Sequence, residues 1–129
     1  MKYLLLVYTD AELLDALPEG EYDGMMKHCL EHADELAAEG TLLGFQQLQP
    51  AATAKAVRIR GDKATVSDGP FAETKELLAG FNLVEADSLE HAIELARQLP
   101  WARTGCIEVR ALRDVDAERQ RVGALKPAA

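Results

Sequence analysis

Two segments of the chain repeat their apolar residues at the spacing of an amphipathic helix. The first covers Glu21 to Glu39 and is followed by Gly40, where a left-handed residue is expected to end a helix. The second starts at Asp87 or Ser88, with the D-x-x-E spacing of a capping box, and ends at Pro100. At 100° per residue the predicted buried stripes are Met26, Cys29, Leu30, Ala33, Leu36 and Ala37 in the first helix, and Leu89, Ala92, Ile93, Ala96 and Leu99 in the second.

Shorter runs that are apolar or that alternate between apolar and polar residues predict β-strands. Val57 and Ile59 alternate with basic residues, and Gly61-Asp62 supplies the turn of a hairpin. The run from Leu77 to Val84 is apolar on both sides, which is typical of a central strand. The predicted strands cover Lys2 to Tyr8, Leu42 to Leu48, the hairpin from Ala54 to Ser67, Leu77 to Val84, and Gly105 to Leu112.

The order of these elements is β-α-β, then a hairpin, then β-α-β. It predicts an α+β fold of the ferredoxin-like, split βαβ kind, in which both helices cover one face of an antiparallel sheet and a β-hairpin is inserted. The other face of the sheet is then apolar and uncovered, so we expect a homodimer whose sheets pack face to face. We assign one domain to residues 1–112 and a charged C-terminal tail, with a short helical piece, to residues 113–129.

Composition and charge exclude several classes of protein. The chain has 129 residues, which suits one domain, and its formal net charge of −8 argues against nucleic acid as a partner. The apolar run from Tyr3 to Tyr8 is too short to cross a membrane. Only two cysteines occur, Cys29 and Cys106, and they are far apart, which favours a reduced cytoplasmic setting over a disulfide framework.

The first helix contains the sharpest short motif, H-x-x-E-H, from His28 to His32. This spacing places two histidines on one helix face, as in a class of zinc proteases. The same residues form the polar face that any amphipathic helix has, and no third ligand is evident, so we expect no bound metal and no cofactor. His32 lies nearer the apolar edge of the helix, where two interpretations stay open: a general base beside a carboxylate, or a solvated surface side chain.

A second candidate site follows the hairpin, in the nine residues from Asp68 to Glu76. Gly69 can adopt a positive φ and Pro70 fixes its own φ, so a tight turn is expected there. Carboxylates next to a lysine shift one another's pKa values and serve acid/base chemistry, although the same groups also form ordinary surface ion pairs. Both interpretations remain open for the ionisable residues of this segment, which are Asp68, Glu73, Lys75 and Glu76.

The segment Asp68 to Glu76, DGPFAETKE, resembles the signature of the DGPF branch of the YCII-related proteins. The start of the chain, MKYLLLVY, and the step Leu48-Gln49-Pro50 are similar to other parts of that family, so the resemblance covers nearly the whole chain. It implies a ferredoxin-like subunit that forms a dimeric α/β barrel. Related YCII proteins carry a His–Asp pair in a pocket, and that His corresponds to a position near Cys29, between His28 and His32. One relative is a dehalogenating enzyme, and some DGPF proteins occur beside sigma-factor-like regions.

Two functions follow from these observations. The first is a small acid/base enzyme acting on a polar small metabolite, in which Asp68 or His32 transfers the proton and Lys75 stabilises charge. Phe71 then forms a wall of the pocket, and Glu73 and Glu76 bind the substrate. The second is a non-catalytic dimeric module that binds a small ligand or a protein partner associated with transcription regulation. A concave pocket that holds Asp68 or Glu73 within hydrogen-bonding reach of a histidine favours the enzyme; side chains spread into solvent favour the binding module.

Overall fold

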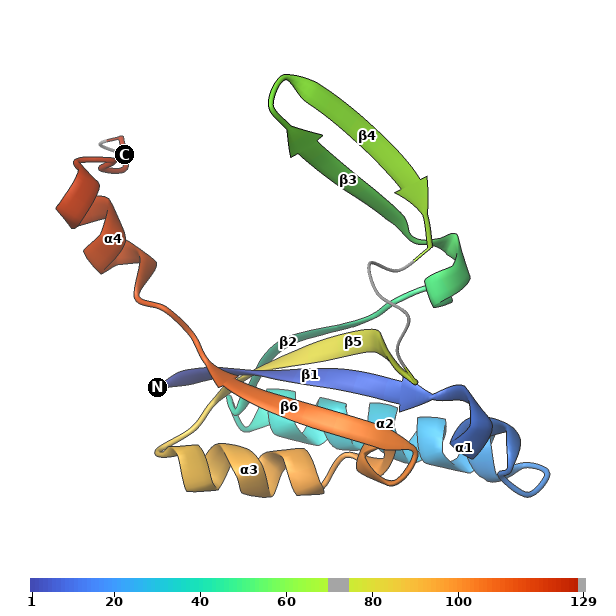
Figure 1. The fold of residues 1–129 in the computed structure, drawn as a ribbon. Helices are drawn as coiled ribbons and strands as arrows, with labels where there is room; N and C mark the ends of the chain where they lie inside the picture. Colours follow the sequence, from blue (N-terminus) through green and yellow to red (C-terminus); the bar gives the residue numbers. More distant parts are fainter. Residues whose placement is uncertain (70–74, 128–129) are drawn as a thin grey trace.

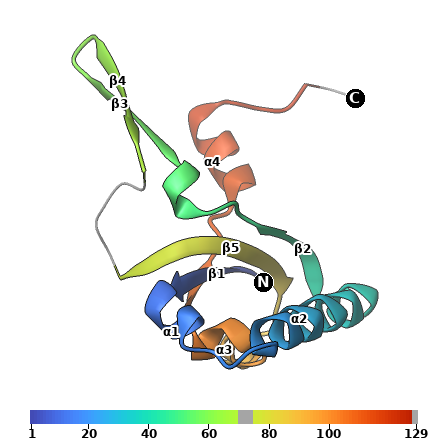
Figure 2. The same cartoon turned by 90° about the vertical axis from the view of Figure 1, so that its right-hand side faces the viewer.

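A computed structural model describes residues 1–69 and 75–127 of the chain, and it has two main layers. A four-stranded sheet forms one layer, and the helices between its strands cover one of its faces (Figures 1 and 2). The elements of this body are β1 (Lys2–Asp10), α1 (Ala11–Asp15), α2 (Glu21–Ala38), β2 (Leu42–Gln47), β5 (Glu76–Glu85), α3 (Leu89–Arg97), the short 3₁₀ turn η2 (Pro100–Arg103) and β6 (Gly105–Ala111). In the described part of the chain, no helix is long and apolar enough to cross a membrane.

The strand order is β2-β5-β1-β6, and each strand is antiparallel to its neighbours. The two β-α-β units therefore interleave, which confirms the predicted α+β arrangement with antiparallel strands and is compatible with a ferredoxin-like fold. The strand predicted over Leu77 to Val84 is central, because β5 lies between β2 and β1.

The alternation along β1 gives the sheet two apolar faces. Tyr3, Leu5 and Val7 are buried at 3%, 1% and 7% exposure, in the core between the sheet and the helices. Leu4 and Leu6 point the other way, because successive side chains of a strand face opposite sides. They lie opposite Leu83 and Phe81 of β5 in the antiparallel register. We call the surface formed by these residues the open face; its members are Leu4, Leu6, Tyr8, Leu78, Phe81 and Leu83.

Helix α2 begins and ends where the sequence predicts, but its buried stripe is narrower. Gly40 has a φ of +80°, in the left-handed region that glycine adopts without steric cost. Cys29, Ala33 and Leu36 are buried, whereas Leu30 is 41% exposed and Ala37 is also exposed. The predicted stripe is therefore wrong at Leu30 and Ala37. Both lie about 80–100° around the helix from Cys29, so the buried stripe covers only one side of the predicted one.

Helix α3 shows the same difference from the prediction. Its N-cap is Ser88, whose hydroxyl accepts a hydrogen bond from the His91 amide at 3.1 Å. Leu89 and Ile93 were expected in the core but are 48% and 37% exposed. The buried residues of α3 are Ala92, Leu95 and Ala96. Leu99, which follows the helix, is also buried, as predicted.

Two appendages leave the body on the side opposite the helices (Figure 1). The first is the hairpin of β3 (Lys55–Arg60) and β4 (Lys63–Asp68), which follows the short 3₁₀ turn η1 (Ala51–Thr53) and forms a separate two-stranded sheet. It confirms the predicted hairpin, including the turn at Gly61, whose φ is +60°. The second is helix α4 (Val115–Val122), in the segment where the sequence predicts a short helical piece.

The close contact between β6 and β1 depends on a glycine, which gives a test of the fold. A Cβ on Gly105 would lie 1.9 Å from the carbonyl oxygen of Tyr8, so Gly105→Ala must push β6 away from β1. We expect this substitution to lower the free energy of unfolding by about 3 kcal/mol, measured by urea denaturation. Gly44→Ala in β2 is the control, because nothing lies within 4 Å of its added Cβ; we expect a change of at most about 1 kcal/mol. Equal losses in the two variants would contradict the register of β6.

Candidate functional site

A pocket of about 370 Å³ lies between the sheet and α2. It is placed toward one end of the sheet, where β1 and β2 end and β5 begins. Strand β5 contributes four consecutive residues, and α1, α2 and η2 close the other side. The lining residues are Val7, Thr9, Leu14, Tyr22, Met26, Cys29, Phe45, Gln46, Gln47, Leu48, Pro50, Ala79, Gly80, Phe81, Asn82 and Trp101.

A close approach of β2 and β5 shapes this end of the sheet. A Cβ on Gly80 would lie 2.6 Å from the carbonyl oxygen of Gln46, so only glycine permits the two strands to come this near. The β1–β5 register also shifts between Val7 and Tyr8, as at a β-bulge. Such irregularities re-aim side chains at the ends of strands and are common beside functional sites.

Aromatic side chains and a thiol form the deep end of the pocket. The Trp101 indole Nε1–H donates a hydrogen bond to the Cys29 Sγ at 3.3 Å, between side chains 72 positions apart in the sequence. The Tyr22 ring lies against Trp101, with centroids 5.5 Å apart and planes inclined by 45°. Trp101 and Cys29 are 7% and 8% exposed, so this wall is fixed by the core rather than by a loop.

The pocket chemistry is neutral. Its described lining residues are apolar, aromatic or uncharged polar, and the polar groups are supplied mainly by Thr9, Gln46, Gln47 and Asn82. The Gln47 side chain donates to the Met26 sulfur at 3.2 Å. An amide such as that of Asn82 can both donate and accept hydrogen bonds. A mostly apolar cavity with a few amides suits an uncharged ligand, because an ion without a countercharge would be costly to bury there.

Three residues predicted around the signature segment, Asp68, Lys75 and Glu76, do not line this pocket. Asp68 ends β4, and its carboxylate is 86% exposed and pairs with the Lys55 ammonium. Lys75 is 70% exposed, with its Nζ 3.8 Å from the Asp10 Oδ2 and 3.7 Å from the Glu12 Oε2. Glu76 begins β5, opposite Asp10 in the register. Phe71 and Glu73 lie outside the described residues.

His32 belongs to a different part of the molecule. Its Nε2 is 2.9 Å from the Gln98 Oε1, and its Nδ1 is 3.8 Å from the Glu35 carboxylate. Its ring stacks on that of His28, with centroids 5.9 Å apart. These contacts tie α2 to the end of α3 in the helical layer, whereas Asp68 lies on the hairpin beyond the opposite face of the sheet (Figure 1). The two predicted proton-transfer residues are therefore not brought together within one chain. Within residues 1–69 and 75–127, no three His, Cys, Asp or Glu side chains are arranged to hold a metal ion.

Asp10 is a buried carboxylate that the sequence interpretation missed. It is 5% exposed and caps α1, where its carboxylate accepts hydrogen bonds from the amides of Glu12 at 2.9 Å and Leu13 at 3.4 Å. Its own amide donates to the carbonyl oxygen of Thr104 at 2.9 Å. An aspartate directly after an apolar strand and before a helical turn is a recognisable N-cap signal. The role is structural, because the carboxylate is already used by the helix.

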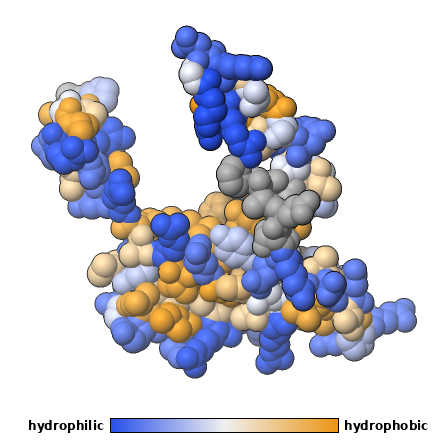
Figure 3. All heavy atoms as spheres, viewed as in Figure 1, coloured by the Kyte–Doolittle hydropathy of each residue, from blue (hydrophilic) through white to orange (hydrophobic). Residues whose placement is uncertain are grey.

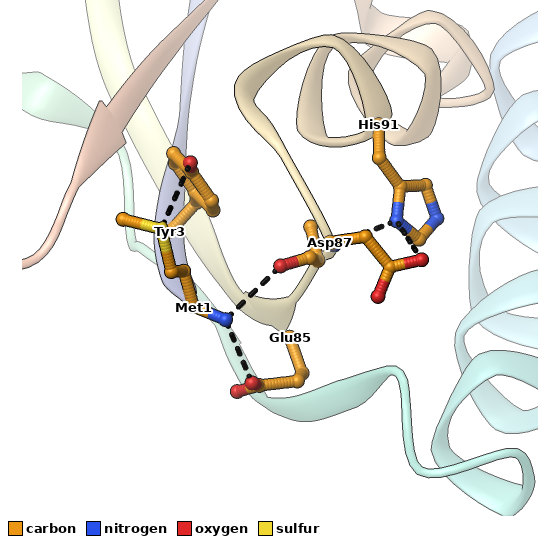
Figure 4. A network of polar contacts seen from close by, with 6 residues as sticks. Met1, Tyr3, Glu85, Asp87 and His91 are labelled. Atoms are coloured by element: carbon orange, nitrogen blue, oxygen red, sulfur yellow. Dashed lines mark hydrogen bonds and ion pairs between the residues drawn. The ribbon is translucent and has the colours of Figure 1, made fainter.

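A second polar network lies at the other end of β1 (Figure 4). The ammonium of Met1 is 2.9 Å from the Glu85 carboxylate and 3.1 Å from the carbonyl oxygen of Ala86. The amide of Asp87 donates to the His91 Nδ1 at 3.0 Å, ahead of α3. The network holds the start of β1 to the end of β5 and is distant from the pocket, so we assign it to the fold.

The open face carries one perturbed group, Tyr8. Its hydroxyl donates to the Glu108 Oε1 at 3.4 Å, across the β1–β6 pair. Burial raises the pKa of Tyr8 above its ordinary value of 10.0, and the nearby Glu108 carboxylate raises this pKa further. Because the neutral phenol is the favoured form, Tyr8 stays protonated to higher pH than an exposed tyrosine.

The Tyr8 pKa can be checked by ultraviolet titration of the tyrosines. We expect Tyr8→Phe to remove a transition whose midpoint lies above pH 10, and Glu108→Gln to lower that midpoint, since a neighbouring negative charge is lost. A Tyr8 midpoint at or below pH 10, or one that Glu108→Gln leaves in place, would contradict this assignment.

Two comparisons with known proteins cover most of the chain. Residues 1–116 match the family model described as the YCII-related domain. An uncharacterised protein of Rhizobium meliloti (strain 1021) is 36% identical over 114 residues, which cover 87% of this chain and 92% of that protein.

Proposed function

The chain belongs to the YCII-related family, and on this basis we propose that it is a non-catalytic, small-molecule-binding protein whose ligand occupies the pocket between the sheet and α2. The observation that carries the proposal is the pocket itself, which combines about 370 Å³ of space with an aromatic wall and uncharged polar groups. Cavities of this size, mainly apolar with a few polar groups, are typical of small-ligand sites. The family resemblance of the sequence also puts the family's pocket histidine near Cys29, which lines this cavity.

The lining indicates the class of ligand. Tyr22, Phe45 and Trp101 offer ring faces and edges to a planar apolar group. Asn82 and Gln47 offer hydrogen bonds to an uncharged polar substituent. An aromatic or conjugated molecule with a hydroxyl, carbonyl or amide group meets both conditions.

The alternative is an acid/base enzyme that acts on a polar metabolite through Asp68, His32 and Lys75. The geometry supports it less well, because none of these residues lines the pocket and Asp68 and His32 lie on opposite sides of the sheet. The strongly exposed carboxylate of Asp68 and the ion pairs of Lys75 agree with ordinary surface electrostatics.

The proposed functional unit is a homodimer in which the open faces of two copies pack together as a dimeric α/β barrel. The open face is apolar over β1 and β5, and Leu78 within it is 41% exposed. An apolar sheet face of this kind is usually covered, and a second copy supplies an equally apolar surface. The pocket lies between the sheet and α2, and Phe81 is the one open-face residue that also lines it, so ligand binding and dimerisation use largely different surfaces.

A fluorescent probe tests the ligand-binding proposal. N-phenyl-1-naphthylamine is neutral and aromatic, and we expect its fluorescence to rise on binding, whereas anionic 2-naphthoate should bind at least about tenfold more weakly, since burying its charge is costly. Asn82→Phe fills the pocket and should weaken binding of the neutral probe by about tenfold or more.

Neighbouring substitutions provide the controls. Leu83→Gln alters the next residue of β5, which faces the open side, and should leave probe binding unchanged. Asp68→Asn and His32→Ala should also leave it unchanged, because both residues lie off the pocket. If Leu83→Gln abolished binding while Asn82→Phe did not, the probe would be on the open face and the pocket proposal would fail.

A further inference from the structure

The β3–β4 hairpin exposes an apolar face that its own chain does not cover. The register places Val57 opposite Val66 and Ile59 opposite Ala64, so these side chains share one face of the hairpin. Val57, Ile59 and Val66 are 67%, 64% and 68% exposed. A two-stranded hairpin is marginally stable in water by itself and needs packing against another layer.

Helix α4 also exposes apolar side chains that its own chain does not cover. It has eight residues, all of them exposed or half-buried, and Val115 and Val122 are 56% and 60% exposed. A helix of this length is not stable in isolation, because nucleation is costly and few hydrogen bonds follow. The apolar residues flanking it, Leu112 and Leu125, are 43% and 62% exposed.

Both appendages rise on the side of the open face, from opposite ends of the sheet (Figures 1 and 2). The space-filling view shows apolar atoms on the body between them (Figure 3). The open face is therefore the floor of a trough whose two walls are the hairpin and α4.

The surface area of the chain indicates how much is left to bury. The structure exposes 9401 Å², whereas a compact monomer of 14.1 kDa exposes about 6,700 Å², an excess of about 2,700 Å². A standard interface buries about 800 Å² on each partner, and obligate homodimers bury more. The excess is enough for an interface that includes the sheet and both appendages.

We propose that the β3–β4 hairpin and α4 are arms that pack on a second copy of the chain docked at the open face. This inference rests on the homodimer proposed above. A second copy fits because it supplies an apolar face of the same width and meets both arms at once. Charge also favours it: the hairpin carries four basic and two acidic side chains in a chain with a net charge of −8, so it is attracted to the acidic body of its partner.

Paired substitutions in the hairpin test the arms. Val57→Lys with Val66→Glu replaces the apolar cross-strand pair by oppositely charged residues, which keeps a favourable pairing within the hairpin. Arg60→Lys with Lys63→Arg alters the pair on the other hairpin face while keeping its positive charge, and is the matched control. Size-exclusion chromatography with light scattering should give a dimer for the unmodified protein, a dissociation constant raised by about tenfold or more for the first variant, and little change for the control.

Hydrogen exchange of the unmodified protein supplies a second readout that needs no variant. The amides of β3, β4 and α4 should exchange more slowly at concentrations where the dimer forms than at concentrations where it dissociates. This result decides the question if the charged variant fails to fold.

Each other outcome overturns the proposal in a distinct way. If the charged variant still forms the dimer and the amides of β3, β4 and α4 exchange fast at every concentration, the proposed role of the arms is wrong. The face-to-face dimer then still stands. If the protein is a stable monomer, both the proposed dimer and the proposed role of the arms are wrong. Slow exchange of the arm amides in that monomer would show that the arms pack on their own chain. Neither outcome affects probe binding in the pocket, which is tested separately.

Discussion

The apolar character of β1 and β5 on both sides of the sheet is the constraint on which the rest of the structure depends. On one side, Leu5 and Val84 are each 1% exposed and form the centre of the core under α2 and α3. On the other side, Leu4 and Leu6 meet Leu83 and Phe81 without a helical cover. Burying a leucine contributes about 1.5–3 kcal/mol, so a face with several of them is expected to be covered. The helices complete half of a core, and we assign the other half to a second chain.

The pocket arises from the same helical layer. Ala33 and Leu36 of α2 are buried in the core against the sheet. Toward the ends of β1 and β2, the larger Tyr22, Met26 and Phe45 side chains stand around a cavity instead of filling it. The result is a neutral, aromatic site in an acidic protein, and ion pairs such as that between Lys75 and Glu12 lie outside it, on the surface. Binding chemistry and surface charge are thus separated within one small domain.

The sequence predicts the fold well because the fold depends on local patterns. The two-residue and 3.6-residue periods identify each strand and helix, and the antiparallel order follows from their succession along the chain. The buried stripes were less accurate, since Leu30 and Ile93 fit the helical period but are 41% and 37% exposed. The width of the layer that packs on a helix determines how much of the helix face is buried. The periodicity of the sequence does not reveal this width.

The candidate site was harder to predict, for a physical reason. Trp101 and Cys29 are 72 positions apart, and their contact depends on the packing of η2 against α2. Asp68 to Glu76 attracted attention because its charges and turn residues are concentrated in sequence, and it remains the segment that resembles the family signature. Although these charged residues are close together in the sequence, Asp68 and Lys75 do not line the pocket. Only Asp10, an N-cap after an apolar strand, carried a local signal that the sequence interpretation overlooked.

The coverage of the open face by a second copy is the central claim, and the thiol of Cys106 reports on it directly. Cys106 is exposed in the single chain and lies opposite Tyr8 in the register, on the open side of β6. Its rate of reaction with a thiol reagent, measured over a series of protein concentrations with Cys106→Ser as the blank, is therefore decisive. We expect a thiol that is protected at high concentration and reacts rapidly on dilution. A Cys106 that reacts rapidly at every concentration would contradict coverage by a second copy.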